Sequence, residues 1–338
     1  MADRSSDHPG PSGVPLAGPA PCREVPLAAV DLEDHTFVTF RAPDLSRLVI
    51  SMREVGLLAP PWLRSKGRRR WQVVAGAKRL WAAAHLGWER VLARTLPAGA
   101  PDSHCLLLAL YDNAFTRGFN LWEQAILAGR LLEHWDRATV AARFLPHLGL
   151  PPAPAFLSRL EALATLEPPF QELAARGRLA LTAGAALARW TPEDRAAARP
   201  FLEQLWLSQS KQERFLEAVA LLGRREAVSP GAVLARREMQ QLLVEPSLNP
   251  QERTEAVRRQ LDGWVYPRLS AARQAYESAL GRLGLAGHPR VRLQPPPAFE
   301  GPDFHLEIKF RDAPELQELL ADITRLTQQE EFSTLTRL

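Results

Sequence analysis

Residues 73–83 of this 338-residue chain read VVAGAKRLWAA and decide the fold of its first part. The apolar residues before Gly76 predict a strand, and those after it predict a helix that Gly87 ends. Gly76 lets the backbone approach a ligand closely, while Lys78 and Arg79 put two cations in the first helical turn. Cations there oppose the helix macrodipole unless an anion binds. The stretch therefore predicts a phosphate-binding turn, and a solvated surface turn is the alternative that these residues leave open.

The neighbouring residues predict a mixed α/β domain over residues 23–105. Its expected elements are an edge strand at 24–27, a helix at 44–55, a hairpin of strands at 61–63 and 71–74, a helix at 76–86 and a strand at 91–95. Asp44 is placed to cap the first helix, and Gly56 is placed to end it. Residues 1–22 are rich in Pro, Gly and Ser, and we expect them to form a disordered leader.

A second informative stretch, residues 111–123, reads YDNAFTRGFNLWE. Asp112 and Asn113 fall at the end of an apolar helix, where a carboxylate and an amide oxygen can hold Mg²⁺ beside the phosphates of a nucleotide. A solvated helix end explains these two residues equally well. Asn120 followed by Glu123 is typical of a capping box, which we favour over a binding role for that pair.

The rest of the chain predicts a helical domain at 106–287, a Pro-rich linker at 288–297 and a small α/β unit at 298–338. In the last unit, residues 305–311 alternate like a strand, and residues 314–326 are amphipathic like a helix.

Two helices expected at 138–148 and 153–166 have the spacing of a helix-turn-helix, so residues 138–166 are its candidate. The second helix offers only Ser158 and Arg159 to base edges. Two such side chains are a poor basis for sequence-specific readout. Plain packing of the two helices is the alternative.

Net charge +4 permits a nucleic-acid partner without requiring one. The expected hairpin turn carries the cations that could contact a DNA backbone, namely Lys66, Arg68, Arg69 and Arg70. A solvated hairpin tip is the alternative for these four residues.

Composition excludes several classes of protein. With 46% hydrophobic and 24% charged residues, the chain is not disordered throughout. Two cysteines cannot frame a disulfide-rich secreted scaffold or a zinc finger. No apolar run reaches the ~18 residues of a membrane helix, and the start lacks a signal-peptide run. We therefore expect a cytoplasmic protein without a membrane partner.

These segments together resemble the ParB family of chromosome and plasmid partition proteins. Residues 76–79, followed by Ala82 and Ala83, resemble that family's Gly-Glu-Arg-Arg segment, and residues 112–123 are similar to its Glu-Asn-Leu-Gln…Asn-Pro-x-Glu segment without a gap. Matches to the family's first strand, its helix followed by Gly-Leu-x-x-Pro, and its C-terminal dimerising strand and helix occur in the same order, at 25–27, 45–60 and 305–316. The resemblance covers residues 23–190 well and continues faintly to the end.

The resemblance implies an α+β chain. It has a small ParB/sulfiredoxin-like N-terminal domain, an all-helical centre and a C-terminal dimerisation unit. It implies a bacterial, nucleoid-associated homodimer that binds CTP with Mg²⁺, closes as a clamp on DNA, hydrolyses CTP slowly and works with a ParA-type ATPase. By position, it implies nucleotide contacts from Gly56, Pro60, Gly76, Ala77, Lys78, Arg79 and Asn113, and metal and catalytic roles for Asp112 and Asn113.

Three departures from the family pattern affect what is expected. Ala77 replaces the family's Glu, Lys78 replaces its first Arg, and Asp112 replaces its metal-side Glu. Because Lys lacks the bidentate geometry of Arg and Asp is shorter than Glu, we expect nucleotide binding to survive more readily than hydrolysis. At most the chain is a slow CTP hydrolase, and a nuclease is not expected without a second acidic cluster. The alternative is an adaptor that has lost CTP hydrolysis and site-specific DNA binding.

Overall fold

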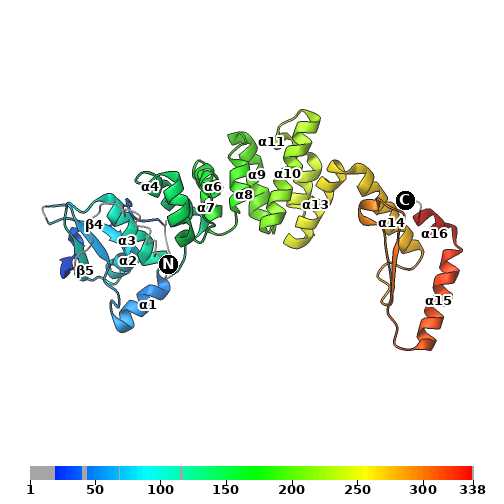
Figure 1. Ribbon diagram of the computed structural model, residues 1–338, viewed down its shortest axis with the longest axis horizontal. Coiled ribbons are helices and arrows are strands. Elements are labelled where there is room, and N and C mark those ends of the chain that lie inside the picture. The colour runs from blue at the N-terminus through cyan, green and yellow to red at the C-terminus, as the bar shows by residue number, and fades with distance from the viewer. Residues whose placement is uncertain (1–19, 40–43, 68, 115–116, 337–338) are drawn as a thin grey trace, which may run out of the picture. The chain divides into compact units, whose positions relative to one another are not determined.

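The computed structural model describes residues 20–39, 44–67, 69–114 and 117–336, and the chain forms two compact units, residues 1–189 and 190–338 (Figure 1). The first unit combines a sheet with helices, and the second is helical except for a small sheet. The expected α+β class is confirmed. Most of the expected leader lies outside the described residues, but Cys22 already belongs to the first strand.

The first unit contains a five-stranded sheet in the order β1-β5-β3-β4-β2. β1 pairs with β5 and β3 with β4 in antiparallel fashion, whereas β3–β5 and β2–β4 are parallel. The expected edge strand and hairpin are thus confirmed. The strands are β1 (Cys22–Pro26), β2 (Val30–Asp31), β3 (Trp62–Ser65), β4 (Trp71–Ala75) and β5 (Arg90–Leu96), with a 3-10 turn at Leu27–Ala29.

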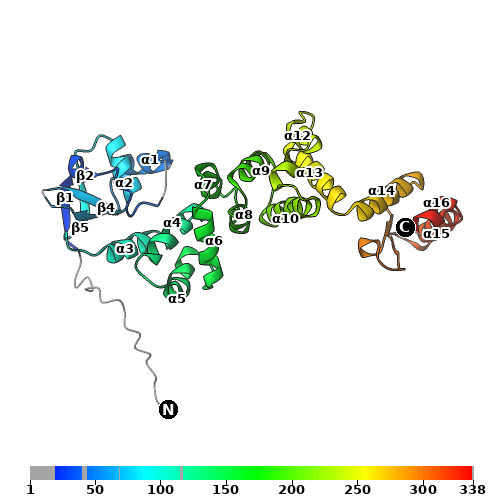
Figure 2. The same ribbon diagram turned by 90° about the horizontal axis from the view of Figure 1, so that it is seen from above.

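Helices α1 (Ser46–Val55) and α2 (Ala77–His85) pack against each other beside the sheet (Figure 2). Their apolar faces close the core, whose fully buried members include Leu63, Leu80, Ala82, Ala83 and Ala93. Asp44 does not cap α1 directly, because Leu45 occupies the N-cap position. The Asp44 carboxylate instead accepts hydrogen bonds from the N–H and the hydroxyl of Ser46.

A helical array follows the sheet in the same unit. α4 packs against α3, α6 and α7, and leucines on these helices form the core between them. The helices are α3 (Asp102–Ala114), α4 (Leu121–Leu132), α5 (Arg137–Thr139), α6 (Pro154–Ala164), α7 (Pro168–Ala175) and α8 (Leu181–Leu187).

The continuous helix expected at 138–148 is not formed. α5 runs into a π-helical turn, Val140–Phe144, and then a 3-10 turn, Leu145–Leu148. Pro146 has no N–H to continue an α-helix, and the N–H of Leu145 bonds to the carbonyl of Val140, five residues back. The second helix expected here is confirmed as α6.

The second unit begins with six helices: α9 (Pro192–Gln204), α10 (Gln209–Glu226), α11 (Pro230–Leu234), α12 (Arg237–Val244), α13 (Pro250–Val265) and α14 (Pro267–Arg282). It ends with β6 (Val291–Gln294), a 3-10 turn (Pro297–Phe299), β7 (His305–Ile308), α15 (Ala313–Thr327) and α16 (Glu330–Leu335). β6 pairs antiparallel with β7, so part of the linker expected at 288–297 is a strand. Among the helices described, none is both long and apolar enough to cross a membrane.

Candidate functional site

The turn between β4 and α2 is built around Gly76. Its backbone is left-handed, with φ of 83° and ψ of 25°, a conformation that only glycine adopts without strain. A Cβ atom placed on Gly76 would lie 2.8 Å from Nη2 of Arg79. The glycine therefore serves both the backbone turn and the close approach of the Arg79 guanidinium.

A cavity of about 370 Å³ opens at this turn. Its polar side consists of residues from the turn, from the end of α3 and from the segment after it: Gly76, Ala77, Lys78, Arg79, Asp112, Asn113 and Arg117. Its apolar side consists of Phe37, Val38, Thr39, Leu48, Ala59, Val74 and Ala75. The cavity thus unites the two sequence segments that were predicted to act together. Gly56 and Pro60 are not among its lining residues, although Ala59 between them is.

Arg79 connects three parts of the cavity. Its Nη2 donates to Oδ2 of Asp112 at 2.6 Å, and its Nη1 donates to the carbonyl oxygen of Ala59 at 2.8 Å. Both side chains of the ion pair are largely buried, at 18% and 26% exposure. One guanidinium therefore holds the end of α3 and the loop after α1 beside the glycine turn.

Arg117 forms a second link, which the sequence analysis missed. Its Nε donates to Oδ1 of Asn113 at 3.0 Å, and its two terminal nitrogens donate to the carboxylate of Glu123 at 2.9 and 2.8 Å. Glu123 is 1% exposed and also closes the expected capping box with Asn120, which is confirmed. The spacing of Arg117 four residues after Asn113 was the signal that could have found it.

The cavity is electropositive. Lys78, Arg79 and Arg117 are its cations, and their nearby carboxylates are Asp112 and Glu123. Burial, and then the neighbouring charge of Arg117, lowers the pKa of Lys78, while Glu123 acts in the opposite direction. An anion bound in the cavity would relieve this repulsion and restore the pKa of Lys78.

Asp112 and Asn113 offer oxygen ligands suited to Mg²⁺, which usually takes one or two carboxylates together with phosphate oxygens. Across the described part of the chain, no group of three or more His, Cys, Asp and Glu side chains could hold a metal ion alone. The two residues therefore fit a metal that a bound phosphate helps to hold.

The residues expected to contact DNA take part in contacts within the chain. The Ser158 hydroxyl accepts a hydrogen bond from Nη2 of Arg137 at 3.0 Å, and Arg159 stacks over Phe156. Lys66 donates to Oδ2 of Asp34 at 2.5 Å. In the same hairpin turn, Arg69 has a positive φ and the N–H of Arg70 bonds to the carbonyl of Gly67, while Arg68 lies outside the described residues. Their roles in DNA binding stay predictions.

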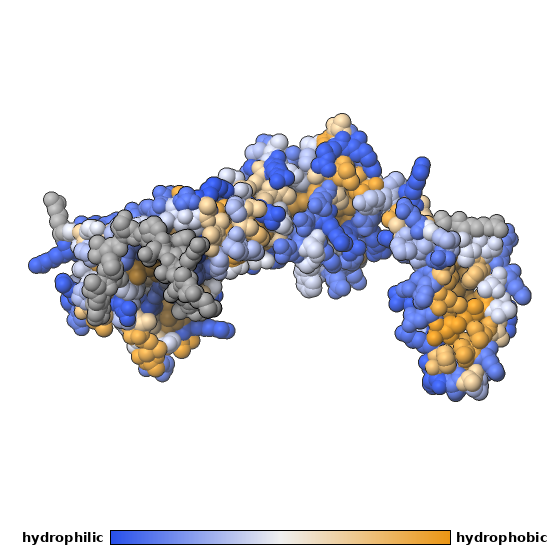
Figure 3. Space-filling model, in the orientation of Figure 1, coloured by the Kyte–Doolittle hydropathy of each residue, from blue (hydrophilic) through white to orange (hydrophobic). Residues whose placement is uncertain are grey.

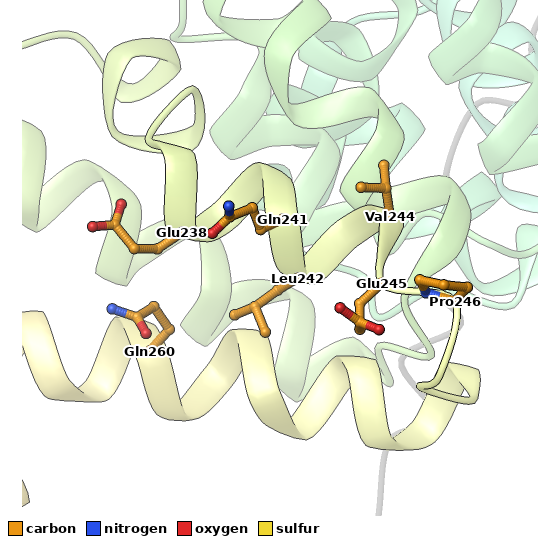
Figure 4. Close-up of a pocket in the computed structure, with 7 residues that line it drawn as sticks. All are labelled: Glu238, Gln241, Leu242, Val244, Glu245, Pro246 and Gln260. Atoms are coloured by element: carbon orange, nitrogen blue, oxygen red, sulfur yellow. The ribbon is translucent and has the colours of Figure 1, made fainter.

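A second cavity, of about 560 Å³, lies in the other unit between α12 and α13 (Figure 4). Its lining is acidic, amide and apolar: Glu238, Gln241, Leu242, Val244, Glu245, Pro246 and Gln260. No residue predicted to bind a ligand lines it. Because its charged lining groups are carboxylates, it does not suit a phosphate.

An apolar face lies on the C-terminal part of the second unit, over β7 and α15 (Figure 3). In the same part of the chain, Leu306, Phe310 and Leu320 are exposed large hydrophobic residues, at 39%, 50% and 46%. Apolar areas of this kind mark interaction surfaces in monomeric chains.

Comparison with known proteins gives one family and several structures. Residues 21–114 match the ParB N-terminal domain. The C-terminally truncated chromosome-partitioning protein ParB from Caulobacter crescentus, complexed to the centromeric parS site, is 23% identical over 58% of this chain and 98% of that chain, with a TM-score of 0.35. The same protein complexed with CTP-gamma-S is 24% identical over 54% of this chain and 99% of that chain, with a TM-score of 0.25.

A Pnob8-like ParB-N domain is 13% identical over 72% of this chain and 97% of that chain, with a TM-score of 0.36. None of the curated proteins compared with the chain matches it. The matched residues 21–114 run from β1 to the end of α3 and contain Gly76, Arg79 and Asp112. The domain that carries the glycine turn, residues 21–114, thus matches the ParB N-terminal domain.

Proposed function

We propose that the cavity beside Gly76 binds the triphosphate of CTP, and that this binding controls the closure of a dimeric clamp on DNA. The observation that carries the proposal is the convergence of three cations and the glycine turn on one cavity of a ParB N-terminal domain. Two segments more than thirty residues apart in the chain supply these groups, as the Arg79–Asp112 pair shows.

The phosphates would lie at the N-terminus of α2. The first N–H groups of a helix have no partner within it and carry a partial positive charge, so they attract anions. Lys78 and Arg79 are in that first turn, and Arg117 faces it from the segment after α3. A triphosphate would thus meet a helix terminus and three cationic side chains.

Phosphate binding would exchange partners within the cavity. Arg79, which donates to Asp112 in this structure, would turn to a phosphate oxygen. Asp112 would then be free to face Mg²⁺ together with Asn113. The bound metal would neutralise charge on the phosphates, and these two residues are the ones that would hold it.

The size and lining of the cavity fit a nucleotide. A volume of about 370 Å³ lies within the ~300–1,000 Å³ typical of small-molecule sites. The apolar side, with Phe37 and Val38, would receive the nucleoside. The shorter carboxylate of Asp112 favours binding without efficient hydrolysis, so the proposed enzymatic activity is at most slow.

The second copy of the chain would bind at the apolar face formed by Leu306, Phe310 and Leu320. DNA would be held mainly through arginine contacts to the backbone, since α6 offers few groups to bases. Together these parts make a nucleotide-gated clamp of the ParB type.

Calorimetric titration of the four ribonucleoside triphosphates with Mg²⁺ into wild type and Arg79→Ala tests the proposal. We expect CTP alone to bind. We expect Arg79→Ala to weaken binding at least ~100-fold. The variant loses two charge-assisted hydrogen bonds from the guanidinium to the phosphates, each worth about 1.5–3 kcal/mol. Arg53→Ala, an exposed arginine on α1, is the matched control and should bind like wild type.

If no nucleotide binds, the proposal fails and the adaptor is the remaining interpretation. The salt dependence of DNA affinity is a second, independent test that separates the clamp from the adaptor. The DNA affinity of a clamp falls steeply with salt. The logarithm of the binding constant falls with the logarithm of the salt concentration, with a slope of about 0.9 for each phosphate contacted. An adaptor binds DNA weakly at every salt concentration.

A further inference from the structure

The apolar side of the cavity includes a stretch of irregular backbone. Residues 32–39, between β2 and the segment leading to α1, form turns and bends without a helix or strand. The last three of them, Phe37, Val38 and Thr39, are 5%, 7% and 8% exposed and line the cavity. We call Phe37–Thr39 the cavity wall. Irregular backbone has no ladder of hydrogen bonds, so its shape depends on side chains that hold it.

Arg130 on α4 provides such a hold, from 92 residues further along the chain. Its Nη1 donates to the carbonyl oxygen of Val38 at 3.2 Å, and its Nη2 donates to that of His35 at 2.9 Å. The N–H of Val38 also bonds to the carbonyl of His35, at 3.2 Å. One planar guanidinium therefore fixes both ends of a tight turn, a geometry that an ammonium group cannot reproduce.

The start of the irregular stretch is held from a different direction. The Asp34 carboxylate accepts hydrogen bonds from Lys66 and Gln72, on the β3–β4 hairpin. These contacts fix residue 34, whereas Arg130 holds the carbonyl of Val38. Loss of Arg130 should thus loosen the wall without releasing the stretch as a whole.

The same helix also contacts the phosphate side of the cavity. Glu123, near the start of α4, binds Arg117, and Arg130 lies seven residues later on the same helical face. At 1.5 Å per residue the two are about 10 Å apart along α4. The helix therefore supports the two sides of the cavity through separate residues, whose effects can be separated by mutation.

We propose that Arg130 is a positioning residue for the nucleoside end of the ligand, holding the cavity wall in the shape that accepts the base and ribose. This inference rests on the proposed nucleotide site. Arg130 donates to the backbone carbonyls of His35 and Val38, so it acts on the nucleoside through the cavity wall. Its removal should cost affinity only for ligands that carry a nucleoside.

The test compares two ligands on the full chain, CTP with Mg²⁺ and inorganic tripolyphosphate with Mg²⁺. In Arg130→Met, which keeps the apolar length but removes the donors, we expect CTP affinity to fall at least ~10-fold. Tripolyphosphate affinity should stay within about twofold of wild type. Arg130→Lys should recover part of the CTP affinity at most, because it offers no bidentate group. Arg143→Met, which removes an exposed arginine stacked on Phe144, is the matched control and should change neither.

Hydrogen exchange without ligand gives a second readout. The amides of the wall should exchange at least ~10-fold faster in Arg130→Met, while those of α2 should not change. Unchanged exchange at the wall, an equal loss for both ligands, or no loss for CTP would each overturn the role of Arg130. Failure of the wild-type chain to bind either ligand would instead refute the proposed nucleotide site. If Arg130→Met does not fold, Arg130→Lys serves in its place, and an unchanged ratio of the two affinities overturns the inference.

Discussion

The cavity beside Gly76 and the exposed face of α6 were both expected to bind phosphate-bearing ligands, and they are built very differently. The cavity gathers side chains from the β4–α2 turn, the end of α3 and the segment that follows it, and its arginines bridge these elements. On α6, Ser158 accepts a hydrogen bond from Arg137 of α5, and Arg159 stacks over Phe156 of the same helix. A site that requires a glycine in the left-handed region and buries charged side chains has a cost to folding, and binding is what would offset it. The face of α6 has no such cost.

The largest effect is expected from a substitution of Gly76 itself. Gly76→Ala forces an alanine into φ of 83° and pushes its Cβ against the Arg79 guanidinium. We expect CTP affinity to fall at least ~10-fold, because the displaced guanidinium no longer faces the phosphates. Isothermal titration measures the affinity and thermal unfolding measures the cost to stability.

Gly87→Ala is the matched control for Gly76→Ala. Gly87 ends α2 with φ of 72°, and a Cβ there would meet nothing within 4 Å. Both variants should lose about 1 kcal/mol or more of stability from the positive φ, but only Gly76→Ala should lose CTP affinity. Equal affinities in the two variants would show that the turn has only a structural role.

The same contrast explains what could be predicted from the sequence. Gly76, Lys78 and Arg79 are local, and the chemistry of a phosphate turn requires them to be adjacent, so a short pattern reveals them. Arg130 binds backbone carbonyls, which leave no trace in the residue types of their own segment. Strand β6 lies in a Pro-rich stretch, and its pairing with β7 depends on residues more than ten positions away.

A smaller effect is expected at Asp34. Its carboxylate forms an ion pair with Lys66, one of the residues predicted to bind DNA. Burial raises the pKa of Asp34, but hydrogen bonds from Lys66 and Thr36 outweigh it and lower that pKa from 3.8 to about 2. Asp34→Asn should therefore destabilise the chain by about 1 kcal/mol at pH 7, since solvent screens this partly exposed pair. Chemical unfolding of both proteins across pH measures the difference.

The pH dependence of that difference follows from the direction of the shift. Because the folded pKa of Asp34 is depressed, its stabilisation is complete well above pH 4 and is lost as pH falls towards 2. Wild type and Asp34→Asn should thus converge in stability below about pH 2. A difference that persists there would mean that the carboxylate charge is not what holds Lys66, leaving that lysine available to DNA.

The smallest effect is expected on α6. Ser158→Ala combined with Arg159→Ala should change affinity for duplex DNA by less than about twofold, whereas one good base contact is worth about 1–3 kcal/mol, or roughly 5- to 150-fold. Arg70→Ala on the β3–β4 hairpin is the comparison. If Arg70 contacts a phosphate, this variant should reduce the slope of log affinity against log salt by about 1. Fluorescence anisotropy at two salt concentrations measures both. A tenfold loss of DNA affinity in the α6 variant, confined to one DNA sequence, would identify α6 as a recognition helix. In that case both the cavity beside Gly76 and α6 would bind ligands. They would differ in whether the ligand must be present to organise the site.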